Sequence, residues 1–156
     1  MKRPFQQVDV FTATPYVGNP AAVVLEADGL STEEMARVAR WTNLSETTFV
    51  LPPTTDGADY RVRIFTPGTE LPFAGHPTLG TCHAWLRAGG VQHHSEHTVQ
   101  ECAAGLIPIR RIDGHDRALS AAALAHMPAI STARANTASS IGSVRRPVNV
   151  FCWLGW

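Results

Sequence analysis

The sequence predicts a single α+β domain, because segments with the pattern of short β-strands occur together with two segments that carry helical signals. The chain has 156 residues, of which 44% are hydrophobic, enough for one ordinary domain with a real core. The clearest strand pattern places Tyr60, Val62 and Ile64 on one face and Arg61 and Arg63 on the other. The segments with a strand pattern are 5–12, 21–25, 47–51, 59–65, 99–102 and 106–111.

The first helix is predicted to begin after Ser31. Glu34 follows three residues later and completes an S-x-x-E capping box, in which each of the two side chains bonds the backbone of the other residue. Met35 and Val38 begin an apolar stripe at helical spacing, and Asn43 is a suitable end.

The second helix is predicted over residues 77–88 and is the centre of the chain. Pro77 suits its first helical position, since the fixed φ fits and the missing N–H would lack a partner there. Arg87 is the only formal charge in this segment, so we expect the helix to be buried on most sides. Gly89 and Gly90 then end it.

The N-terminus of this helix is predicted to be an anion site. Gly75 lets the backbone bend tightly and lets a ligand come close. The helix opens at Gly75 and His76 with free N–H groups and a partial positive charge, which favours a substrate carboxylate. Pro77 and Thr78 complete this set of candidate substrate-binding residues.

The whole-chain properties exclude several classes of protein. The formal net charge is zero and the pI is about 7.1, which gives no reason to expect nucleic acid or an acidic membrane as a partner. No apolar run approaches the roughly 20 residues that span a bilayer, and the N-terminus has no signal-peptide pattern. Three widely spaced cysteines, Cys82, Cys102 and Cys152, indicate reduced thiols. We therefore expect a cytoplasmic protein.

Two side chains are candidates for acid–base chemistry. Glu46 lies between Leu44 and an apolar strand, where partial desolvation would raise its pKa into a useful range. The alternative is a solvated glutamate at a strand end. His76 at the helix start is a candidate for substrate binding or proton transfer, against a purely structural role.

Other polar residues have a weaker case. Asn19 is a candidate ligand for a substrate carboxylate, but also an ordinary turn residue. His83 is most simply a core histidine. His93, His94 and His97 lie in a polar loop without the fixed helix of a zinc-protease motif, so we expect no metal site.

Three stretches resemble motifs of the PhzF family, the phenazine-biosynthesis-like isomerases. They are VDVF and GNPA within residues 8–21, NLSETTFV in residues 43–50, and RIFTP followed by ELPFAGHPTLG within residues 63–80. Their order and spacing both agree with the family, and the likeness covers residues 4–113.

The resemblance implies a diaminopimelate-epimerase-like fold, in which each of two similar halves wraps a curved, mostly antiparallel sheet around a central helix. It also implies a reaction without cofactor or metal, in which Glu46 moves a proton on carbon and His76 lies beside it. Gly75 and His76 would hold a small carboxylic acid substrate. In related cysteine-dependent racemases a reactive cysteine stands where Ala74 stands here, which argues for carboxylate chemistry.

The C-terminal part departs from the family. Family members run to nearly twice this length, the motif of their second half is absent, and no Asp or Glu occurs after Asp116. We therefore expect a PhzF-like N-terminal half-domain over residues 1–116 and a divergent, poorly ordered tail over 117–156, produced by truncation or a frameshift. An alanine-rich helix at 118–125 is the alternative for part of the tail.

Two functions follow from these expectations. The first is a PhzF-type isomerase that shifts a proton on a small carboxylic acid, impaired by the missing half. The second is a non-catalytic fragment that binds small anions or assembles with a partner. Uncovered inner faces would favour a homodimer.

Overall fold

The computed structural model describes residues 2–111, 119–121 and 150–153. In this part of the chain, eleven elements follow one another: β1 (Phe5–Val10), β2 (Asn19–Val24), α1 (Thr32–Thr42), β3 (Glu46–Leu51), β4 (Tyr60–Phe65), β5 (Glu70–Leu71), α2 (Gly75–Arg87), β6 (His97–Cys102), β7 (Gly105–Arg111), β8 (Leu119–Ala121) and β9 (Val150–Trp153). No helix of the described residues is long and apolar enough to cross a membrane.

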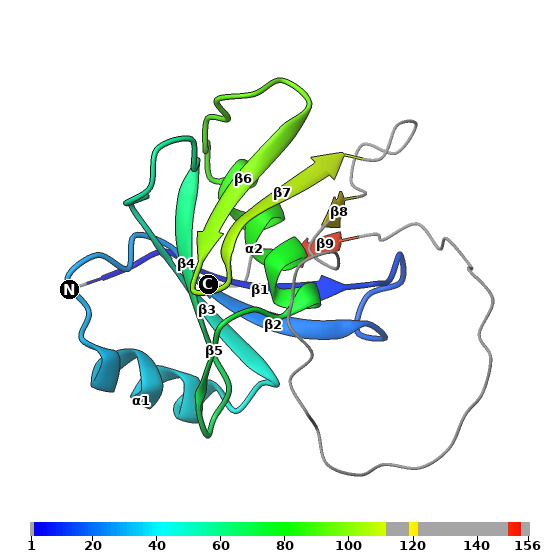
Figure 1. Cartoon of the computed structure of the whole chain (residues 1–156). Helices are drawn as coiled ribbons and strands as arrows, with labels where there is room; N and C mark the ends of the chain where they lie inside the picture. The colour runs from blue at the N-terminus through cyan, green and yellow to red at the C-terminus, as the bar shows by residue number, and fades with distance from the viewer. Residues whose placement is uncertain (1, 112–118, 122–149, 154–156) are drawn as a thin grey trace, which may run out of the picture.

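The strands form one mixed sheet in the order β8-β7-β6-β4-β3-β2-β1-β9, with β5 paired to β4 (Figure 1). Neighbouring strands are antiparallel except for the pairs β2–β3 and β4–β6, which are parallel. The parallel β2–β3 pair sets Ala21 opposite Glu46, so the start of β3 lies beside the start of β2. The α+β class predicted from the sequence agrees with this arrangement.

Helix α1 covers part of one face of the sheet. Its N-terminus has the predicted capping box between Ser31 and Glu34, and Asn43 ends it in the left-handed conformation. Met35 and Ala39 are buried against apolar side chains of β2, β3 and β4. The local helical signals of this segment are therefore confirmed.

Helix α2 packs on the main core. It contacts β1, β2 and β3, and also β6, β8 and β9. Gly80 permits a close approach to β1, because a Cβ there would lie 3.1 Å from Val10. On the β3 side, the Thr81 hydroxyl donates a buried hydrogen bond of 2.7 Å to the Thr48 hydroxyl, which donates to the Ala22 carbonyl at 3.2 Å.

The start of α2 differs from the prediction. The helix begins at Gly75, so Pro77 is its third residue and not its first. Proline is tolerated here because none of the first-turn N–H groups has a partner within the helix. Gly75 is not left-handed, and a Cβ built there would meet nothing within 4 Å. Gly75 therefore leaves open space in front of the helix, and its backbone conformation is not one that requires glycine.

Most of the expected tail, 117–156, lies outside the described residues. Two short pieces of it are strands: β8 pairs with β7, and β9 pairs with β1. The alternative of a helix over 118–125 is wrong for Leu119–Ala121, which form β8.

Candidate active site

The site is built where the start of β3 meets the start of α2. Glu46 is the first residue of β3, and His76 is the second residue of α2. Oε2 of Glu46 lies 3.1 Å from Nε2 of His76, and the two side chains are 16% and 9% exposed. The structure thus brings together two candidates that are thirty residues apart in sequence.

This close pair is not a completed hydrogen bond. Both facing atoms are buried, yet neither has a hydrogen-bond partner among the described residues. The two atoms are within the distance of an ion pair, but their geometry is not that of a hydrogen bond. Buried polar atoms in this condition cost free energy, and a ligand group that bonds both would recover it.

His76 is held as a neutral ring. Burial lowers its pKa below the ordinary 6.5, while the Glu46 carboxylate and a hydrogen bond to the Pro20 backbone act in the opposite direction. That bond must be accepted by the Pro20 carbonyl, since proline has no N–H. A neutral imidazole can accept a proton or donate one.

The first turn of α2 is open to an anion. Its N-cap, Ala74, supplies no side-chain hydrogen bond, so the N–H groups of Gly75 and His76 have neither a cap nor a partner within the helix. Gly75 is exposed, whereas Pro77 and Thr78 are buried. The Thr78 hydroxyl accepts a hydrogen bond of 3.0 Å from the Gln100 amide, so this side chain is engaged in the core.

Asn19 lies beside the same pair. The Ser45 hydroxyl donates to Oδ1 of Asn19 at 3.3 Å and lies 3.4 Å from the Pro20 carbonyl. Asn19 opens β2, and Ser45 immediately precedes Glu46. This contact ties the two strand ends and leaves the Asn19 amide N–H₂ group for a ligand.

Sequence reasoning missed Phe11. Its ring centroid lies 6.3 Å from that of His76, and its side chain is 53% exposed. Its φ of 69° is unusual for a bulky residue. The turn is fixed around it, because the Asp9 carboxylate accepts the Tyr16 N–H at 2.8 Å, and a Cβ on Gly18 would lie 2.4 Å from Asp9 and Val10. The residues Pro15, Gly18, Asn19 and Pro20 do indicate a turn-rich loop. No residue-level signal predicts the positive φ of Phe11 or its place beside His76.

The loop before α2 is held by an ion pair and by a tight turn. The Arg63 guanidinium donates to both carboxylate oxygens of Glu70, at 2.7 and 2.6 Å. Thr66 closes a tight turn by donating its N–H to the Thr69 carbonyl at 2.8 Å. These bonds hold the chain that leads into Gly75.

The loop histidines are engaged elsewhere. His93 bonds the buried Asp59 carboxylate at 2.7 Å through both its backbone N–H and Nδ1, and His94 stacks on His97. His83 is half-buried on α2 and has an interaction partner. Across the described residues, no group of three His, Cys, Asp or Glu side chains is placed to hold a metal ion.

One known protein family matches most of this chain. The model of the phenazine biosynthesis-like protein family, PhzC-PhzF, matches residues 8–143. The chain belongs to this family. The match extends beyond residue 113, where the sequence resemblance was expected to end.

Relatives of this PhzF-family chain include isomerases. It is 54% identical over 110 residues to antisense-enhancing sequence 1 of Schizosaccharomyces pombe, covering 70% of this chain and 37% of that protein. It is 49% identical over 109 residues to trans-2,3-dihydro-3-hydroxyanthranilate isomerase of Pseudomonas aeruginosa, covering 69% and 37%. The chain thus spans little more than a third of the length of each relative.

Solved structures give the same result. A PhzF-family protein from Bacillus anthracis has a TM-score of 0.66 and 39% identity, covering 76% of this chain and 39% of that one. A probable proline racemase from Agrobacterium radiobacter K84 has a TM-score of 0.56 over 76% of this chain and 40% of that one. Its identity of 17% means that the likeness concerns the fold alone.

Proposed function

We propose that this chain carries the acid–base half of a PhzF-type isomerase, which shifts a proton on carbon of a small carboxylic acid. The observation that carries the proposal is the pair of buried, unpartnered atoms, Oε2 of Glu46 and Nε2 of His76, 3.1 Å apart at an uncapped helix N-terminus. A carboxylate beside a neutral imidazole can take up a proton and return it when water is excluded.

Each residue has a role in this scheme. Glu46 abstracts the proton from one carbon and returns it to another carbon on the same face of the substrate. The N–H groups of Gly75 and His76 bind the substrate carboxylate at the positive end of α2. The Asn19 amide donates to the same carboxylate, while Pro77 and Thr78 shape the turn from inside. His76 keeps Glu46 oriented and shares the proton.

No cofactor is required for this chemistry. The charge that develops on the substrate is an enolate-like anion, and N–H donors at a helix start stabilise such a charge directly. We therefore propose a cofactor-independent reaction.

The position of α2 supports a diaminopimelate-epimerase-like half-fold. In a flat sheet, the seven steps between β8 and β9 would span roughly 34 Å, whereas a helix is about 10 Å wide. Yet α2 contacts both β8 and β9. We infer that the sheet curves around α2 as a central helix.

The experiment is carbon–hydrogen exchange in deuterated water. We expect trans-2,3-dihydro-3-hydroxyanthranilate, or a related unsaturated acid, to take up deuterium, and Glu46→Gln to reduce this rate by about 10²- to 10⁴-fold. Glu33→Gln is the control, since that carboxylate is exposed on the first turn of α1, away from the site. Equal exchange by wild type and Glu46→Gln would refute the role of Glu46.

A second candidate is a non-catalytic module that binds small anions or assembles with a partner. It is favoured by the exposed apolar side chains of the segment between β1 and β2, Phe11, Tyr16 and Val17, which are 53%, 78% and 70% exposed. Carboxylate binding at Gly75 and His76 without any exchange would support this module over the enzyme.

A further inference from the structure

We propose that a second site, at the opposite end of α2, binds a small organic cation. A cavity of about 550 Å³ lies around the last turn of the helix and the strand ends next to it. This volume is in the range of small-molecule sites. The proposal is independent of the isomerase function, because none of its residues belongs to the Glu46–His76 site.

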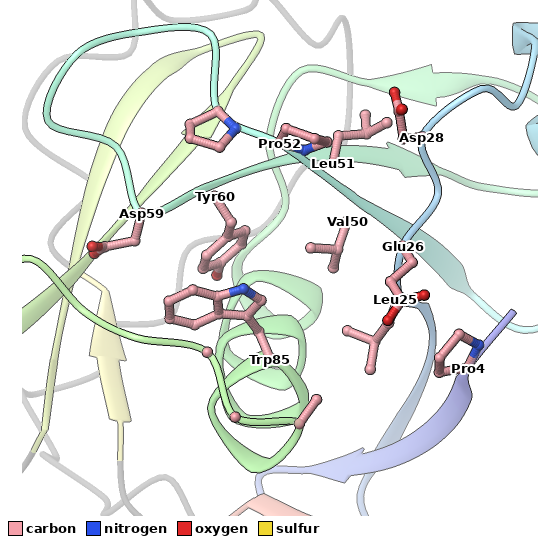
Figure 2. A pocket seen from close by; sticks show the side chains of 14 residues that line it. Pro4, Leu25, Glu26, Asp28, Val50, Leu51, Pro52, Asp59, Tyr60 and Trp85 are labelled. Atoms are coloured by element: carbon pink, nitrogen blue, oxygen red, sulfur yellow. The ribbon is translucent and has the colours of Figure 1, made fainter.

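The floor and walls of the cavity are apolar. Figure 2 shows Trp85 and Tyr60 on one side, with Leu25 and Val50 facing them. The Trp85 and Tyr60 rings pack with centroids 4.9 Å apart, and Gly90 lies so close to the indole that a Cβ there would be 2.3 Å away. Trp85 is therefore a fixed wall against which an apolar body can pack.

Among the described residues, every charged side chain that lines the cavity is acidic. These side chains are Glu26, Asp28 and Asp59. The Asp59 carboxylate is occupied, since it accepts the His93 N–H at 2.7 Å and the Val99 N–H at 2.6 Å. Glu26 and Asp28 are exposed, and the described residues provide no hydrogen-bond partner for their carboxylates.

The backbone adds to this negative potential. Ala88, Gly89 and Gly90 line the cavity just past the C-terminus of α2, where the helix dipole is negative. The Arg3 guanidinium donates to the backbone carbonyls of Glu26 and Asp28. It thereby fixes the rim and leaves both carboxylates available.

The rim also stores backbone strain. Glu26 has a φ of 53°, in the left-handed region that a glutamate rarely adopts. The flanking hydrogen bonds hold it there, with the Leu25 N–H bonded to the Pro4 carbonyl at 2.9 Å and the Ala27 N–H to the Val50 carbonyl at 2.8 Å. In Figure 2 Glu26 lies across the cavity from Trp85. An ammonium group bonded to Glu26, with its apolar body against Leu25 and Trp85, matches this arrangement.

The test is a titration of the ¹⁵N-labelled full chain with benzylamine, which is protonated at neutral pH, and with its neutral analogue benzyl alcohol. We expect saturable shifts of the backbone amides of Gly89 and Gly90 and of the Trp85 indole, with benzyl alcohol binding at least fivefold more weakly. Glu26→Gln should weaken benzylamine about fivefold, the scale of a partly exposed ion pair. Raising the salt concentration should weaken it further.

The control variant is Glu33→Gln, an exposed acid on the first turn of α1, outside the cavity. It should leave benzylamine binding unchanged. Equal affinity for benzylamine and benzyl alcohol, an unchanged affinity in Glu26→Gln, or shifts centred on His76 would each overturn the proposal.

Discussion

The two ends of α2 present opposite surroundings. At the N-terminal end, N–H groups without a cap face the Glu46–His76 pair, and the space before Gly75 is open. At the C-terminal end, Glu26 and Asp28 rim an apolar cavity beside Trp85. We propose that the positive end of this one buried helix binds an anion and that its negative end binds a cation, so the charge of a ligand should decide which end it occupies.

The largest effect is expected from one added methyl group at the C-terminal end of α2. Gly90→Ala places a Cβ 2.3 Å from the Trp85 indole, so the ring must move. We expect a loss of about 2 kcal/mol in the free energy of unfolding by urea denaturation, together with loss of benzylamine binding. Gly68→Ala, where a Cβ meets nothing within 4 Å, is the matched control. Equal stability of both variants would contradict the packing at this end.

The second prediction concerns the hydrogen bond that attaches α2 to β3. Thr81→Val removes the donor to Thr48 and leaves a buried hydroxyl with one bond fewer. We expect a loss of about 1 kcal/mol in stability and a slower exchange reaction, because His76 shifts relative to Glu46. Thr32→Val, at the exposed first residue of α1, is the control for both measurements. A Thr81→Val variant with wild-type stability would show that this bond does not fix the helix.

The pH dependence of stability reports on the neutral state of His76. Its folded pKa lies below the ordinary 6.5, because burial outweighs Glu46 and the Pro20 carbonyl. Between the folded value and about 6.5 the unfolded chain binds more protons, so stability is present above this window and falls as the pH decreases through it. Urea denaturation from pH 7.5 to 5.5 should show a shallower decrease for His76→Gln than for wild type and for the exposed His94→Gln. Identical slopes would argue against a buried neutral ring.

The smallest effect is expected at Glu26. Glu26→Gly relieves a φ of 53° and should raise the free energy of unfolding by about 0.5 kcal/mol, while benzylamine binding falls. Stability and binding then change in opposite directions, as expected for a strained residue that serves a ligand. Calorimetry and the same titration measure both. A decrease in stability would show that the Glu26 side chain supports the fold.

Local signals predicted most of the fold. The capping box at Ser31, the alternation from Tyr60 to Ile64 and the apolar surface of α2 depend on neighbours within one or two turns, so the sequence contains them directly. The start of α2 was misplaced by two residues, because proline fits any position of a first turn.

The site was predictable only in part. Glu46 and His76 were each ambiguous from the sequence alone, and the family resemblance, not any local pattern, indicated that they lie together. The positive φ of Phe11 and the cavity around Trp85 were not predicted, since neither a positive φ nor contacts between distant segments leave a local pattern.

Anion binding at the start of α2 is tested most directly by titrating the ¹⁵N-labelled chain with benzoate. Benzoate is an aromatic anion of about the same size as benzylamine. We expect saturable shifts of the Gly75 and His76 amides, unchanged amides of Gly89 and Gly90, and an altered benzoate affinity in Glu46→Gln. Benzoate shifts at the C-terminal end of α2, or no shift at Gly75 and His76, would contradict this expectation.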